Sequence, residues 1–185
     1  MKNRFLTDKL CLVAFCIAIN VVCPFIAMNL RLPIYMDSIG TILVTRLFGP
    51  VYGIMAGVCG SLLCGITFDV YSLYYFPVQI LTSLMTYYAC KNGWLEGKKT
   101  LLAGIMISLP TAIVSAVITA FVFGGITAAG SSYIVVLLNN LGVGLTASCF
   151  IVQVLTEYCD KPLAALVTGK VVERGHLGDR YGTIQ

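Results

Sequence analysis

The strongest constraint on the fold of this chain is a series of long apolar stretches that charged residues rarely interrupt. Of its 185 residues, 58% are hydrophobic and only 11% are charged, whereas charged residues make up about a quarter of a typical soluble domain. Apolar runs of roughly 17 to 25 residues match the thickness of a bilayer when they are helical. The runs lack the alternation of a membrane β-barrel. The sequence therefore predicts an all-α integral membrane protein.

Six apolar segments predict six transmembrane helices in a single membrane domain over residues 1–160. Their approximate ranges are 10–28, 34–48, 51–68, 73–90, 101–123 and 133–158. The second is short and contains Asp37 and Ser38, so its outer end is expected to be covered by protein or to lie at the interface. Residues 161–185 are expected to form a cytoplasmic C-terminal segment that is partly amphipathic and then polar. It would be either an interfacial helix or a continuation of the sixth span.

The uneven distribution of cations predicts how these segments are oriented. Cytoplasmic flanks of transmembrane helices are enriched in Lys and Arg, so the side that carries most cations is expected to face the cytoplasm, together with both termini. Arg31, Asp37 and Asp69 are then the charges expected on the outer face. The cations assigned to the cytoplasmic side are Lys2, Arg4, Lys9, Arg46, Lys91, Lys98, Lys99, Lys161, Lys170, Arg174 and Arg180.

Polar and aromatic residues gather near the predicted outer face and suggest a binding pocket. Gln79 follows Tyr75 by about one helical turn, and polar side chains inside a membrane need partners or a cavity. Tyrosine rings beside amides suit a neutral aromatic small molecule. Alternatively, the tyrosines form an interfacial belt and the amides bond between helices. The candidate binding residues are Asn29, Arg31, Tyr35, Asp37, Asp69, Tyr71, Tyr74, Tyr75, Gln79, Asn139 and Asn140.

Arg31 is open to two interpretations, since it could contact the ligand or pair with Asp37 or Asp69 to hold the outer loops together. Small residues suggest close helix contacts elsewhere. Gly53 and Gly57 lie four residues apart, as do Gly49 and Gly53, so they share one helical face. Packing within the chain is favoured over a partner interface, and the Gly49-Pro50 pair predicts a tight turn.

Other residue types exclude several kinds of chemistry. The eight cysteines form no CxxC pair, and His176, the single histidine, lies in the polar tail, so the cysteines are expected to pack in helices rather than bind metal. No nucleophile-and-base motif or phosphate loop is present. We expect neither an enzyme nor a bound cofactor. The net charge of +4 belongs to the cytoplasmic flanks, so a nucleic-acid partner is not expected.

Three short motifs carry a resemblance to a known family. They are Ala14-Phe-Cys-Ile-Ala18, Leu32-Pro-Ile-Tyr-Met-Asp-Ser-Ile-Gly-Thr41 and Leu47-Phe-Gly-Pro-Val-Tyr-Gly53. With six short helices and cytoplasmic termini, the chain to about residue 160 resembles the substrate-binding S-components of energy-coupling factor (ECF) vitamin transporters. The second motif, ahead of the Gly-Pro turn, resembles the riboflavin-transporter-like branch.

The resemblance implies that the chain captures a vitamin or vitamin precursor at the extracellular face of a prokaryotic plasma membrane. Riboflavin, ribazole and a deazapurine are examples of the neutral, nucleoside-like ligand expected. It also implies docking through Ala14 and Ala18 onto a membrane coupling subunit driven by two ATPase subunits, as in an ABC importer. From the residues alone, that small-residue pair is equally compatible with ordinary helix packing. The alternative function is a membrane sensor or assembly subunit without transport.

Overall fold

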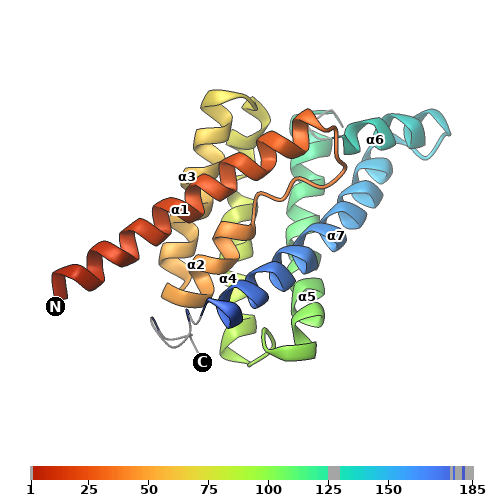
Figure 1. The fold of residues 1–185 in the computed structure, drawn as a ribbon. Coiled ribbons are helices and arrows are strands. Elements are labelled where there is room, and N and C mark those ends of the chain that lie inside the picture. The colour runs from red at the N-terminus through yellow and green to blue at the C-terminus, as the bar shows by residue number, and fades with distance from the viewer. Residues whose placement is uncertain (1, 125–129, 176, 178–180, 182–185) are drawn as a thin grey trace.

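A computed structural model describes residues 2–124, 130–175, 177 and 181 of the chain. Over these residues the fold is all-α and contains seven α-helices (Figure 1). Turns of 3-10 helix at Val70–Tyr74 and Gly97–Lys99 precede α4 and α5, and a π-helical turn at Ile118–Val122 extends α5. The helices are α1 Lys2–Asn29, α2 Ile39–Phe48, α3 Pro50–Thr67, α4 Phe76–Lys91, α5 Thr100–Val117, α6 Ser131–Asn140 and α7 Leu145–Arg174.

Three helical segments are long and apolar enough to cross a membrane, which indicates a membrane protein. They are Leu6–Asn29, Pro50–Thr67 and Thr100–Val122, and each approaches or exceeds the roughly 20 residues that a bilayer core requires. The shorter helix α2 is also apolar. The expected all-α fold is thus confirmed, and three of its described helices, where six spans were predicted, are long and apolar enough to span a membrane.

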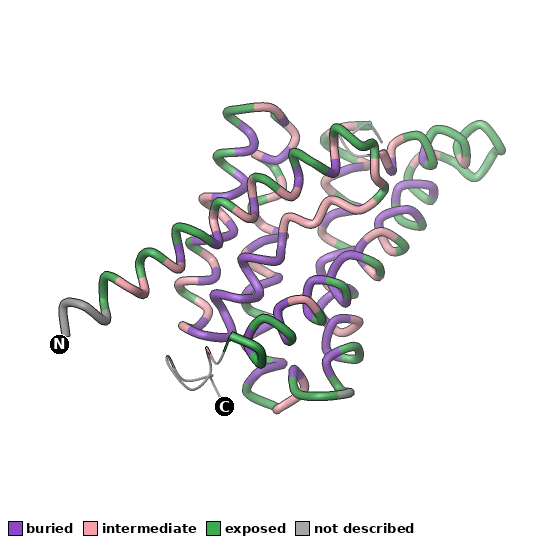
Figure 2. The backbone as a smooth tube through the Cα atoms, in the orientation of Figure 1, coloured by how far each residue is buried: buried purple, intermediate pink, exposed green. Residues whose placement is uncertain are grey.

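Helix α2 lies at the centre of the fold and is buried along nearly its whole length (Figure 2). It packs against α1, α3, α4 and α7. Its C-terminal end is set by Gly49, whose φ of 93° is a conformation that glycine adopts without the cost borne by other residues. Pro50 then begins α3, where its missing N–H costs nothing. The predicted Gly-Pro turn is therefore confirmed.

Helix α3 approaches its neighbours through glycines, as the four-residue spacing predicted. A Cβ atom on Gly57 would lie 2.8 Å from Thr41 Oγ1 and 2.8 Å from the Cβ of Gln79. A Cβ on Gly53 would collide with the hydroxyls of Thr45 and Ser83. The small residues of α3 thus pack inside the chain, against α2 and α4.

Helices α5 and α7 form the most extensive contact between elements. Gly104 of α5 lies so close to Pro162 of α7 that a side chain at this position would overlap the proline backbone. One turn further along α5, the Ser108 hydroxyl donates to the Glu157 carbonyl at 3.0 Å. This contact holds the middle of α7 firmly against α5.

The structure corrects the predicted sixth segment, which was drawn as one helix over residues 133–158. Two helices, α6 and α7, occupy this region, and a short turn separates them. Gly142 and Gly144 in this turn have φ values of 88° and 80°, which are incompatible with a continuous α-helix. Helix α7 then runs without a break past residue 160 to Arg174. The tail therefore begins as a continuation of this helix, and the domain boundary expected at residue 160 falls inside it.

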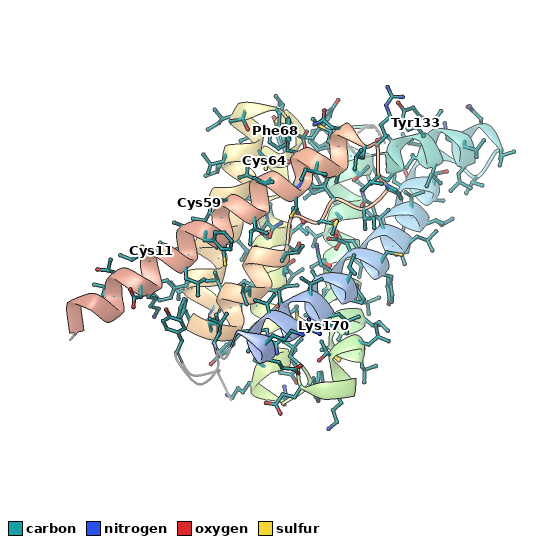
Figure 3. The ribbon with its side chains drawn as sticks, in the orientation of Figure 1. Cys11, Cys59, Cys64, Phe68, Tyr133 and Lys170 are labelled. Atoms are coloured by element: carbon teal, nitrogen blue, oxygen red, sulfur yellow. The ribbon has the colours of Figure 1, made fainter. Side chains whose placement is uncertain are left out.

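The connections between the helices lie at two opposite ends of the bundle. The α2–α3 turn, the α4–α5 connection and the C-terminal end of α7 lie at one end, and the loop over residues 30–38 lies at the other (Figure 1). Lys170 is exposed on α7 (Figure 3). Lys161 is different, because it is only 1% exposed and its ammonium contacts Asp37 in the 30–38 loop, so it does not lie on the predicted cytoplasmic flank. Arg180 and His176 lie outside the described residues.

The cysteines lie within the helices as free thiols. Cys16, Cys64, Cys90 and Cys149 are buried, while Cys11 and Cys159 are exposed. Figure 3 labels Cys11 on α1, and Cys59 and Cys64 on α3, the helix that packs against α1. Within the described residues, no group of three or more His, Cys, Asp or Glu side chains is arranged to hold a metal ion.

Candidate ligand-binding site

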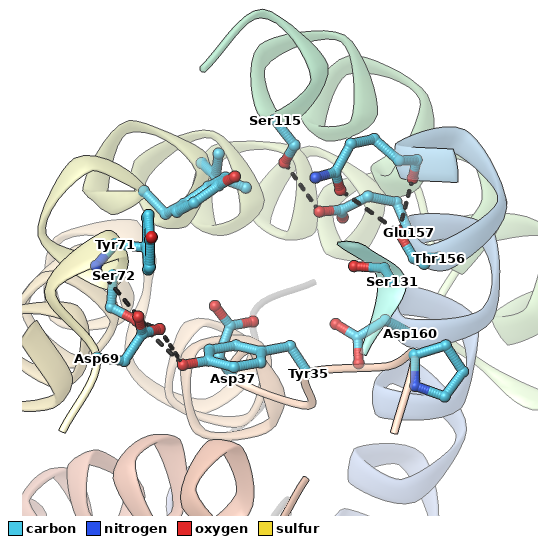
Figure 4. Close-up of a pocket in the computed structure, with 14 residues that line it drawn as sticks. Tyr35, Asp37, Asp69, Tyr71, Ser72, Ser115, Ser131, Thr156, Glu157 and Asp160 are labelled. Carbon is cyan, nitrogen blue, oxygen red and sulfur yellow. Dashed lines mark hydrogen bonds between the residues drawn. The ribbon is translucent and has the colours of Figure 1, made fainter. Parts of the chain in front are cut away.

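A cavity lies at the end of the bundle that carries the 30–38 loop (Figure 4). It is partly open to solvent, and its volume is about 80 Å³, below the roughly 300–1,000 Å³ that is typical for pockets of drug-sized molecules. Carboxylates, hydroxyls and tyrosine rings face it from several helices. Its lining consists of Pro33, Tyr35, Asp37, Asp69, Tyr71, Ser72, Tyr75, Val78, Ser115, Ser131, Gln153, Thr156, Glu157 and Asp160.

The loop before α2 forms one wall of the cavity and is held at both ends. Gly130 N–H donates to the Leu32 carbonyl at 3.2 Å, which joins the loop to the start of α6. Met36 has a φ of 58°, an uncommon conformation for a residue other than glycine. Its backbone N–H donates to Asp160 Oδ1 at 2.9 Å. The strained backbone at Met36 is thus fixed by a carboxylate from α7 and presents Tyr35 and Asp37 to the cavity.

Asp69 organises the opposite wall. Its side chain caps the 3-10 turn by accepting from Tyr71 N–H at 3.1 Å, and it accepts from the Ser72 hydroxyl at 2.7 Å. The Tyr35 hydroxyl also donates to it. Burial and the Asp69 carboxylate raise the pKa of the Tyr35 phenol above its ordinary value, so this phenol stays protonated at neutral pH and keeps its donor role. Tyr35 therefore ties the 30–38 loop to the turn before α4.

Three carboxyl groups gathered around one lysine form the floor between the loop and α7. The Lys161 ammonium lies 3.2 Å from Glu157, 3.2 Å from Asp160 and 3.7 Å from Asp37. It also donates to the Ser38 hydroxyl at 2.6 Å. Charged groups in a membrane protein interior are expensive unless they find partners, and this lysine contacts carboxylates from two parts of the chain.

Helix α5 fixes the carboxylate of Glu157. Thr111 and Ser115 lie one turn apart on α5, and each hydroxyl donates to a different Glu157 oxygen at 3.0 Å. The residue is only 9% exposed. With Lys161 as a further partner, Glu157 is held in one orientation at the edge of the cavity (Figure 4).

A chain of hydrogen bonds continues from the cavity into the centre of the bundle. Gln79 Nε2 donates to Asp37 Oδ2 at 2.7 Å, and Gln79 Oε1 accepts from the Thr41 hydroxyl at 2.8 Å. Asn20 of α1 then donates to Thr41 at 2.9 Å. Gln79 therefore lies behind Asp37 and orients it, instead of lining the cavity itself.

Aromatic rings form the remaining side. The rings of Tyr71 and Tyr74 meet Phe123 edge-on, with centroids 4.8 and 5.1 Å apart, and Tyr75 stacks with Phe123 at 6.1 Å. The Tyr75 hydroxyl is bonded to Thr119. Tyr71 and Tyr75 thus present fixed ring surfaces to the cavity, while Tyr74 is half-exposed outside it.

The structure brings together five of the predicted binding residues as cavity lining, namely Tyr35, Asp37, Asp69, Tyr71 and Tyr75. The others lie elsewhere. Asn29 bonds to its own helix through Phe25, and Asn139 and Asn140 are exposed at the end of α6.

Arg31 is exposed and does not line the cavity. Within the described part of the chain it forms no ion pair with Asp37 or Asp69. Asp37 pairs with Lys161, and Asp69 is bound by neutral donors.

Sequence reasoning missed the contribution of α7 to the cavity. Gln153, Glu157 and Asp160 follow one another at intervals of four and three residues, which places them on one helical face. This spacing was the available signal. The predicted sixth span ends at Tyr158, so Asp160 falls outside it and Lys161 was predicted on the cytoplasmic flank.

The fold and the cavity define a helical membrane protein with an acidic, partly aromatic pocket at one end. Comparisons with protein-family models, with curated proteins and with solved structures found no match for this chain.

Proposed function

We propose that this chain is the substrate-capture subunit of an ECF-type importer in a prokaryotic plasma membrane. The observation that carries the proposal is the cavity at one end of the bundle, which has the mixed polar and aromatic lining of a small-molecule site. The resemblance of three sequence motifs to ECF S-components supports it independently. One of them, residues 32–41, supplies Tyr35 and Asp37 to this cavity.

In this proposal α1, α2, α3, α4, α5 and α7 are the six crossing helices, and α6 lies near the outer surface. Arg46, Lys91 and Lys170 belong to the end of the bundle away from the cavity. By the preference of cytoplasmic flanks for cations, this end and both termini face the cytoplasm. The cavity then opens toward the cell exterior, where a capture subunit meets its substrate.

The proposed ligand is a small, ring-containing vitamin or vitamin precursor. Tyr71 and Tyr75 support a ring, because their faces are fixed against Phe123. The expectation of an uncharged ligand rested on there being few charges near the outer face. Glu157 and Asp160, which also line the cavity, remove that ground.

The proposed partner is a membrane coupling subunit with two ATPase subunits. Ala14 and Ala18 are exposed on the outward face of α1, where small side chains would let another helix approach closely. Their exposure supports the docking hypothesis, although a lipid-facing helix would expose them as well.

Purification in detergent followed by native mass spectrometry tests the capture role. We expect a small molecule to be retained in a one-to-one complex, and absence of any bound compound together with no binding to candidate vitamins contradicts the proposal. For docking, Ala14→Trp and Ala18→Trp should abolish uptake in a reconstituted complex and leave ligand affinity unchanged. Phe15→Trp, at an exposed neighbour, is the matched control. Unaltered uptake in both alanine variants would refute docking through this face.

A further inference from the structure

We propose that the ligand of the cavity is a small organic cation that carries a planar ring. The inference rests on the proposed capture function and specifies the chemical class of its substrate. It follows from three properties of the lining, which are an excess of carboxylates, the position of the nearby lysine and the placement of the tyrosine rings.

Carboxylates dominate the charge of the cavity. Four of them, Asp37, Asp69, Glu157 and Asp160, line it, and the lining includes no Lys or Arg. Lys161 compensates part of this charge from behind, through its contacts with three of the four. With all groups ionised, the site therefore carries three more negative charges than positive ones.

Asp69 is the carboxylate that Lys161 does not reach. Its partners are the hydroxyls of Tyr35 and Ser72 and the backbone of Tyr71, and within the described residues no cationic side chain pairs with it. It is only 5% exposed. Neutral donors stabilise an ionised carboxylate without neutralising its charge, so the ionised form of Asp69 would attract a cation in the adjoining space.

The tyrosine rings lie close to Asp69 in the chain and line the same cavity. Tyr71 and Ser72 follow Asp69 in the same turn, and Tyr75 begins the next helix. A cation over a tyrosine face is attracted by the ring as well as by the carboxylate. The planar part of the ligand can stack on Tyr71 or Tyr75, while its charged group lies between Asp69 and the Asp37 side of the cavity.

Two other occupants fit the lining less well. An anion would face four carboxylates. A neutral molecule with several hydroxyl groups could donate to the carboxylates but would leave their charge uncompensated. Since like charges in a low-dielectric site raise the free energy of the empty protein, only a cation removes that cost on binding.

Matched pairs of ring compounds that differ in charge test the inference on the purified full-length protein. Suitable pairs are benzamidinium and benzamide, benzylammonium and benzyl alcohol, and the N-methylnicotinamide cation and nicotinamide. Thermal stability at millimolar ligand and isothermal titration measure binding, and mass spectrometry identifies any compound that co-purifies. We expect the cationic member of a pair to bind more tightly and the co-purified ligand to carry a positive charge.

Variants then locate the charge. Asp69→Asn should weaken cation binding by roughly tenfold or more and leave the neutral partner compounds unaffected. Glu157→Gln should act in the same direction, which guards against a folding defect in either variant alone. Glu96→Gln, an exposed carboxylate in the α4–α5 connection at the other end, is the matched control and should bind as the wild type does.

The outcomes separate this inference from the proposed function. The inference that the ligand is cationic is refuted if the co-purified ligand is neutral or anionic, or if both members of every pair bind equally. Either result leaves the proposed capture role intact. Failure to bind any small molecule overturns both. Cation binding without association with a coupling module keeps the inference about the cavity and refutes the role in transport.

Discussion

Replacing Lys161 by methionine tests whether one ammonium group holds the floor of the cavity together. The side chain is 1% exposed, and its nitrogen contacts Asp37, Glu157 and Asp160 within 3.7 Å. Methionine retains the length and most of the apolar contacts of the lysine stem. Lys161→Met therefore removes the charge with little change of volume.

The loss of stability depends on which hydrogen-bond donors the carboxylates keep once the ammonium is removed. Glu157 retains Thr111 and Ser115 as donors, and Asp160 retains Met36 N–H. At 3.2 Å, one ion pair has about 5 kcal/mol of gross Coulomb attraction at an effective dielectric constant of about 20. Desolvation of the ammonium offsets much of this in the wild type. Removing one partner of a buried ionic cluster has a net cost of about 3–5 kcal/mol.

Thermal unfolding of the purified protein in detergent measures this cost. For a chain of this length a loss of 3–5 kcal/mol corresponds to a fall in Tm of about 6–20 °C. Lys170→Met, on the exposed side of α7 (Figure 3), is the matched control and should change stability by less than about 0.5 kcal/mol. Adding Glu157→Gln to Lys161→Met should restore part of the loss, because it removes one uncompensated charge. If the Tm of Lys161→Met equals that of the Lys170→Met control, the lysine does not stabilise the cluster.

Two further predictions concern packing and the residue behind Asp37. Gly57→Leu would place its side chain against Gln79 and Thr41 of neighbouring helices, so we expect the free energy of unfolding to fall by about 1–3 kcal/mol or more. Size-exclusion chromatography should then show a low yield of monodisperse protein. The control Val51→Leu, on the exposed face of α3, should behave as the wild type. Gln79→Leu should weaken ligand binding only because it leaves Asp37 without its orienting hydrogen bond. In a double-mutant cycle, Gln79→Leu should therefore have little further effect on affinity when Asp37→Asn is already present. Additive losses of affinity would show that Gln79 contacts the ligand directly.

Local patterns in the sequence were sufficient to predict the helix-packing surface of α3. A spacing of four residues between Gly53 and Gly57 determines that they share a helical face, whatever surrounds the helix. The turn at Gly49 and Pro50 is local in the same sense. Such features depend only on neighbours along the chain, so they can be predicted without knowledge of the tertiary structure.

The position of Lys161 could not be predicted in this way. A lysine that follows an apolar run has the same local pattern whether it flanks a membrane or pairs with buried carboxylates. What distinguishes the two cases is Asp37, which lies 124 residues earlier in the chain and is brought to Lys161 by the packing of α2 against α7. The exposed position of Asn139 and Asn140 likewise could not be predicted, because it depends on the break at Gly142 and Gly144. In a continuous helix over this region, residues 131–140 would extend along the axis of α7.

The proposed ligand accounts for the ionic cluster better than stability of the fold does. Replacement of a buried ion pair by well-packed apolar residues is often neutral or stabilising, and charges within a membrane protein are rarer still unless they serve a function. Helices α5 and α7 already meet closely at Gly104 and Pro162, so their contact does not require the charges. A cluster that served only to join helices would also be balanced, with one cation for each carboxylate. Here Lys161 is shared among three carboxylates, and Asp69 has no cationic partner among the described residues. The surplus of carboxylates faces the cavity, where the proposed cationic substrate would balance it.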